Sequence, residues 1–205
     1  MVHLCVAVAL SERMGASPSA DFLLGNLAPD AIHARPDSTR RDKEHVHLID
    51  RDIAPPGLLA VFQDNYGVNG SRPSGFAGGY LVHLLTDRLW WQTTIIPFRN
   101  SFPPSLPDRE IRRLYYHDTD RIDLELYRRM PWQPQAWASL GTAATAGFPP
   151  FLTAGEIYQW RDRVLRWYDD PARDFTIEPV YISLTATLAF IERAAREIAE
   201  LFLVV

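Results

Sequence analysis

Apolar residues recur at helical spacing along most of the chain. Between Ser74 and Ile96 they fall at intervals of three, four and five residues, which predicts a buried helix. Pro97 is expected to end this helix, because proline cannot continue the ladder of backbone hydrogen bonds. Similar stripes predict three more long helices, over residues 108–127, 153–168 and 179–203. The first of these is expected to end before Pro131, and Thr153 with Glu156 forms a predicted capping box.

Shorter segments complete the predicted fold. Brief helices are expected over residues 2–10, 22–26 and 53–62, separated from the long ones by connectors rich in proline, glycine and serine at 34–41, 65–73, 99–107 and 141–150. Gly25 is expected near the end of the second helix, and Pro55 is confined to the first turn of the third. No pair of alternating strands is evident. The sequence therefore predicts an all-α fold, with residues 1–205 forming a single bundle-like domain of six or seven helices.

Composition restricts the classes of function. The chain has 205 residues, enough for one domain, and its formal net charge of −4 comes without a concentrated basic face, so no nucleic-acid partner is expected. The apolar N-terminal run lacks the basic start of a signal peptide and is interpreted as the first helix. No apolar run approaches the ~20 residues of a membrane span. With Cys5 as its only cysteine, the chain is expected to be cytoplasmic.

The distribution of histidine is the main chemical signal. All six histidines precede residue 118: His3, His33, His45, His47, His83 and His117. His83 and Asp87 are four residues apart in the most apolar predicted helix, so both side chains face the same way. A buried carboxylate needs a partner, and a metal ion would satisfy both groups. The alternative is that Asp87 pairs with Arg88 while His83 bonds a carbonyl group.

Three other segments carry possible ligands. Asp30 ends an apolar turn and is a candidate ligand or a helix cap. His45 and His47 are two residues apart, so we expect only one of them to bind a metal directly. His117 and Asp120 share a helix face and form either a cation-binding edge or an ordinary solvated surface.

Together these segments resemble the zinc-dependent phospholipase C family, including its small bacterial members. The resemblance covers about residues 1–127 and is carried by three stretches, Gly25-Asn26-Leu27-Ala28-Pro29-Asp30, His47-Leu48, and Gly79 through His83 to Asp87. A fourth stretch, from Tyr115 to Asp123, is also similar to a segment of the small members. It implies a phospholipase C/P1 nuclease-like helical fold. It also implies that Asp30, His47, His83 and Asp87 hold one metal, and that His3 helps to hold a further one.

The chain also departs from this family. It begins Met1-Val2 where the secreted phospholipases use a tryptophan ligand, and no histidine follows His117 to build a third metal site. We therefore expect one or two divalent transition metals, with zinc favoured over iron or manganese. His45 and His117, the latter together with Asp120, are candidate ligands for the second.

The function expected from these residues is hydrolysis of a small-molecule or lipid phosphoester by a metal-activated water. Asp30 would act as both ligand and catalytic base, as the resemblance implies. One alternative is a His-Asp type phosphohydrolase centred on His117-Asp118. Another is a non-enzymatic helical interaction protein, with the segment Trp132–Trp137 serving a partner. The sequence leaves the oligomeric state unknown.

Overall fold

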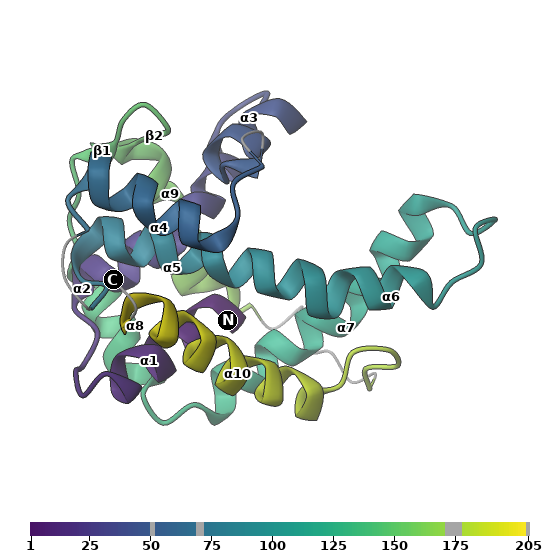
Figure 1. Cartoon of the computed structure of the whole chain (residues 1–205). Coiled ribbons are helices and arrows are strands. Elements are labelled where there is room, and N and C mark those ends of the chain that lie inside the picture. The colour runs from purple at the N-terminus through teal and green to yellow at the C-terminus, as the bar shows by residue number, and fades with distance from the viewer. Residues whose placement is uncertain (50–51, 69–71, 171–177, 204–205) are drawn as a thin grey trace.

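The computed structural model describes residues 1–49, 52–68, 72–170 and 178–203, and most of these residues lie in helices (Figure 1). The α-helices are α1 (Val2–Arg13), α2 (Ala20–Leu27), α3 (Arg40–Val46), α4 (Pro55–Tyr66), α5 (Gly75–Trp90), α6 (Ile96–Asn100), α7 (Asp108–Arg129), α8 (Gln133–Thr142), α9 (Ala154–Trp167) and α10 (Leu184–Leu203). A 3₁₀ helix, η1 (Ala28–Ala34), follows α2, and a π-helical turn, η3 (Trp91–Ile95), follows α5. Two short strands, β1 (Gly147–Phe148) and β2 (Leu152–Thr153), pair antiparallel.

The centre of the fold is the contact between α2 and α5. Two glycines allow the helices to approach closely, because neither has a side chain to hold them apart. Gly25 of α2 lies against the backbone of Phe76, and Gly79 of α5 lies against the backbone of Phe22. This packing fixes the position of α5 relative to η1, which continues directly from α2.

The other helices surround this pair and bury one continuous apolar cluster, which includes residues from Leu4 in α1 to Phe202 in α10. α10 packs along α1, and α9 packs on η1. The predicted capping box at the start of α9 is confirmed, because the Thr153 side chain accepts from the Glu156 backbone while the Glu156 side chain accepts from the Thr153 backbone. The all-α expectation is confirmed in this coarse sense.

Local details differ from the sequence expectations. Pro97 does not end the long helix, because it occupies the first turn of α6, where its missing N–H costs no hydrogen bond. Gly25 lies inside α2 and does not end it. The segments 40–46 and 133–142 add helices, so the described residues form more than the six or seven expected. The β1–β2 pair, two residues in each strand, was too short to give an alternating pattern.

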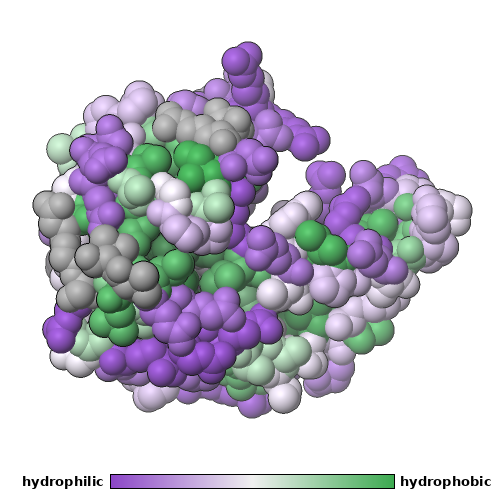
Figure 2. All heavy atoms as spheres, in the orientation of Figure 1, coloured by the Kyte–Doolittle hydropathy of each residue, from purple (hydrophilic) through white to green (hydrophobic). Residues whose placement is uncertain are grey.

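The surface has a marked hollow. Figure 2 shows it between the body of the molecule and the projecting arm that α6 and the adjoining end of α7 form in Figure 1. Exposed apolar side chains on or near this arm include Trp91, Ile96 and Tyr116. Among the described residues, no helix combines the length and the apolar character needed to cross a bilayer.

Candidate metal centre

Five histidine and aspartate side chains from four elements meet beside α5. They are His3 of α1, Asp30 of η1, His47 at the C-terminal end of α3, and His83 and Asp87 of α5. Their ligand atoms form two groups, His3–Asp30–His83 and His47–His83–Asp87, and the atoms of each group lie within 4.8 Å of one another. The fold therefore brings together the four residues that the resemblance implied, with His3 beside them. We refer to these five residues as the cluster.

The Asp87 carboxylate lies between imidazole rings on two sides. Its Oδ1 is 2.9 Å from His3 Nε2, whereas its Oδ2 is 3.6 Å from His47 Nε2 and 3.5 Å from His83 Nε2. Asp30 Oδ1 lies 3.7 Å from His47 Nε2. The rings of His3 and His83 stack with their centroids 3.9 Å apart. Asp87 thus offers a different oxygen to each set of histidines.

Backbone carbonyl groups orient two of the rings. His83 Nδ1 lies 2.7 Å from the Asn26 carbonyl oxygen, and His47 Nδ1 lies 3.0 Å from the Lys43 carbonyl oxygen. Since a carbonyl oxygen only accepts hydrogen bonds, Nδ1 of each ring carries the proton. The Nε2 atom of each ring then faces the cluster, as in metal sites whose ligands are held by outer hydrogen bonds.

The cluster has a buried side and an open side. The side chains of His47 and His83 are 3% and 1% exposed, whereas those of His3, Asp30 and Asp87 are 26%, 32% and 36% exposed. Buried nitrogens therefore form the floor of the site, and the two carboxylates reach the solvent.

The charges of the cluster influence one another strongly. Burial opposes ionisation of Asp87, but the positive charges of His83 and His3 outweigh it and hold the pKa of Asp87 well below its ordinary value. Burial also opposes ionisation of Asp30, but the hydrogen bond to His47 and the positive charge of His83 outweigh it and lower the pKa of Asp30. Burial would lower the pKa of His83, but Asp87 and Asp30 raise it above the ordinary value. The site therefore favours ionised carboxylates and attracts positive charge.

Two residues of α5 hold the segment around His47 in place. The Tyr80 hydroxyl donates to the Val46 carbonyl oxygen at 2.7 Å, and Arg88 Nη2 donates to the Leu48 carbonyl oxygen at 3.1 Å. Leu48 has a φ of 52°, which is uncommon for a residue with a Cβ atom. Neither tether could be predicted from the sequence, since no local spacing connects α5 to backbone groups 34 and 40 positions earlier.

Three of the predicted ligands lie outside the cluster. Neither metal-capable group found in the described part of the chain includes His45, His117 or Asp120. The ring of His45 lies 5.3 Å from the ring of Phe151, so of the two neighbouring histidines only His47 faces the cluster. A second metal held by His45 or His117 therefore finds no support in the geometry.

Asp118 has a structural position. It is fully buried, and its carboxylate accepts hydrogen bonds from the backbone N–H groups of Val180, Tyr181 and Ile182 at 2.7–3.0 Å. His117 Nδ1 lies 2.9 Å from the same carboxylate. These contacts occupy both carboxylate oxygens and fix the segment before α10, which gives no support to a catalytic dyad at this position.

The Trp132–Trp137 segment does not present an open aromatic surface. Trp132 packs against the core, and the Trp137 ring contacts the rings of Tyr127 and Tyr168. Its indole N–H donates to the Leu165 carbonyl oxygen at 3.4 Å. These tryptophans serve packing among α7, α8 and α9.

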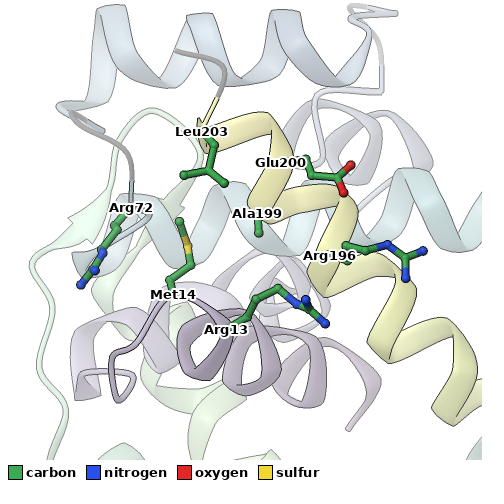
Figure 3. Close-up of a pocket in the computed structure, with 7 residues that line it drawn as sticks. All are labelled: Arg13, Met14, Arg72, Arg196, Ala199, Glu200 and Leu203. Carbon is green, nitrogen blue, oxygen red and sulfur yellow. The ribbon is translucent and has the colours of Figure 1, made fainter.

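A cavity of about 520 Å³ lies elsewhere on the molecule (Figure 3). It is lined by Arg13, Met14, Arg72, Arg196, Ala199, Glu200 and Leu203. Met14 follows the last turn of α1, whereas His3 is in its first turn, so the cavity is about 16 Å from the cluster along the helix axis. It contains none of the cluster residues.

No family model, curated protein or solved structure matches this chain. Its function must therefore be inferred from its own residues.

Proposed function

We propose that this protein is a metal-dependent hydrolase of phosphoesters. His3, Asp30, His47, His83 and Asp87 would hold one or two divalent transition metals, with zinc favoured and iron or manganese as alternatives. The proposal extends the resemblance to zinc-dependent phospholipase C, and it is supported by the convergence of these five side chains from four elements.

The observation that carries the proposal is the way the ligand atoms of the cluster face one another. With Nδ1 bonded to a carbonyl oxygen, His83 directs Nε2 toward Asp87 Oδ2 at 3.5 Å, and His47 does the same at 3.6 Å. His83 Nε2 is buried and has no hydrogen-bond partner among the described residues. An imidazole nitrogen and a carboxylate oxygen that face each other need a proton or a metal ion between them, and a single dication could serve both rings at once.

The spacing is compatible with zinc. Tetrahedral zinc with ligands at about 2.0–2.1 Å requires ligand atoms roughly 3.3 Å apart. The separations from Asp87 Oδ2 to His47 and His83 are within a few tenths of an ångström of this value. Because Asp87 Oδ1 faces His3, these two residues are the ones that would help to hold a second ion.

The metal and the residues around it would have separate roles in hydrolysis. A bound dication would lower the pKa of a water molecule to about 7 and neutralise charge on the phosphoryl group. His47 and His83, fixed by their Nδ1 hydrogen bonds, keep the geometry rigid. Asp30 is ionised and one third exposed, so its free oxygen is the candidate acceptor for the proton of the attacking water.

Elemental analysis tests the proposal directly. Protein purified without added metal or chelator should contain one or two equivalents of transition metal, and His83→Ala should lose it because His83 belongs to both ligand groups. The matched control is His45→Ala, which removes a nearby histidine outside the cluster and should retain the metal. Circular dichroism checks that both variants keep their helices.

Since His83 is buried, Asp30→Asn provides a milder second variant with a partly exposed side chain. Wild type and the variants are then assayed with p-nitrophenyl phosphate and bis(p-nitrophenyl) phosphate after zinc is restored. Wild-type protein that contains no metal and takes up neither zinc, iron nor manganese would refute the proposal.

A further inference from the structure

A lysine–histidine pair lies next to the cluster. Lys43 is the only lysine of the chain, and its Nζ is 3.3 Å from His33 Nε2. An ammonium group only donates hydrogen bonds, so His33 Nε2 accepts and the His33 ring is neutral. Burial and the Lys43 charge both lower the pKa of His33, which keeps the ring neutral. We call these two residues the rim pair.

The rim pair lies beside two of the proposed metal ligands, Asp30 and His47, on the same two elements. Asp30 and His33 are three residues apart in the 3₁₀ helix η1, and side chains at that spacing eclipse. Lys43 and His47 are four residues apart at the end of α3, a spacing that also places them on one face. η1 and α3 therefore contact each other twice. Asp30 contacts His47, and one helical turn away His33 contacts Lys43.

The distance between these two contacts follows from helix geometry. Three residues of a 3₁₀ helix and four of an α-helix both rise about 6 Å. The rim pair therefore lies about one helical turn, or ~6 Å, from the contact of Asp30 with His47, where the proposed site would hold the scissile phosphoryl group.

In the described part of the chain, no carboxylate offsets the charge of Lys43. The acidic neighbours on α3 are paired elsewhere, Asp42 with Arg35 and Glu44 with Arg40. The only contact of the Lys43 ammonium among the described residues is with His33. The Trp160 ring lies 5.7 Å from the His33 imidazole. The guanidinium of Arg163, a second cation, lies over this indole.

We infer that the rim pair binds a second anionic group of the substrate. This inference rests on the proposed function and narrows its substrate class to phosphoesters that carry another phosphate or carboxylate about 6 Å from the scissile group. Lys43 would donate to this group as a charged donor, and His33, whose Nδ1 carries its proton, would be a second donor.

Non-hydrolysable probes test the inference without requiring turnover. We would measure the affinities of zinc-loaded protein for methylphosphonate and for propane-1,3-diphosphonate by calorimetry, after a zinc titration of each variant. Wild type should bind the diphosphonate about tenfold more tightly than methylphosphonate. Lys43→Gln should reduce this ratio to near one and leave the affinity for methylphosphonate unchanged. A 3-phosphonopropionate arm shows whether a carboxylate can serve as the second anion.

Arg109→Gln is the matched control, since it removes one positive charge from a side chain that is 87% exposed on α7, away from the rim pair. It should keep the wild-type ratio. If zinc binds to wild type and to Lys43→Gln but the ratio is the same in both, the rim pair inference is wrong and the proposed function stands. If wild type binds neither zinc, iron nor manganese, both are wrong.

Discussion

The substitution Gly79→Ala tests whether the α2–α5 contact holds the metal ligands in place. A Cβ atom added at Gly79 would lie 2.8 Å from the Asn26 backbone nitrogen and closer still to the Phe22 carbonyl oxygen. Both atoms belong to the backbone of α2, so no side-chain rotation can relieve the overlap. The two helices must separate.

The size of the effect follows from these contacts. Relief of the overlap requires a shift on the order of 1 Å, because carbon and oxygen atoms pack above 3 Å. Overpacking of this kind costs about 1–3 kcal/mol of folding free energy. The same shift moves His83 on α5 away from Asp30, which follows α2 directly. Metal–ligand distances tolerate only about 0.2 Å, so zinc affinity should fall by at least about tenfold even in folded protein.

The control is Gly141→Ala, at a helical glycine of α8 with nothing within 4 Å of the added Cβ. It should stabilise the protein by about 0.5–1 kcal/mol, because alanine favours the helix more than glycine does. Urea unfolding gives the free energies, and competition with a chromogenic chelator gives the zinc affinities. If Gly79→Ala keeps both the stability and the zinc affinity of wild type, the contact does not set the ligand geometry.

Two other substitutions separate the cluster from purely structural residues. In chelator-treated protein, the low pKa of Asp87 stabilises the fold at pH values above the unfolded pKa of about 3.9, and this contribution is lost as the pH falls through the lower folded value. Wild type should therefore melt at a higher temperature than Asp87→Asn above about pH 4, and the difference should disappear in stronger acid; a pH-independent difference would contradict the charge argument. Asp118→Asn replaces an acceptor of three backbone N–H groups and should cost about 2–3 kcal/mol of unfolding free energy while leaving zinc binding intact. Loss of metal in Asp118→Asn without loss of stability would instead favour the His-Asp phosphohydrolase reading.

Periodicity predicted the long helices well because each buries one face against a common core. It wrongly predicted helix ends at Pro97 and Gly25, because the surrounding structure determines the role of each of these residues. Pro97 is tolerated because a π-helical turn precedes it and places it in the first turn of a new helix. Gly25 looked like a helix end, but it is required by the close approach of α5, which no local pattern reveals.

The sequence identified candidate ligands but did not show which of them lie close together in the fold. Helical spacing related His83 to Asp87, but only the fold brings His3, Asp30 and His47 to them from other elements. The choice between His45 and His47 could not be made from spacing, because it depends on where α3 ends and on the tethers from α5. The pairing of His33 with Lys43 could not be predicted from the sequence, since it depends on the alignment of η1 with α3.

The two sides of the cluster indicate how a substrate would reach it. His47 and His83 are buried and held by hydrogen bonds to backbone carbonyl groups, so their rings cannot move aside to let a ligand enter. His3, Asp30 and Asp87 are partly exposed, and any coordination position not filled by the chain must therefore face the solvent on their side. The rim pair extends from Asp30 and His47 along η1 and α3. A phosphoester bound through its scissile group at the carboxylates would thus extend toward Lys43, and this direction of entry connects the proposed metal site to the proposed selectivity for a second anion.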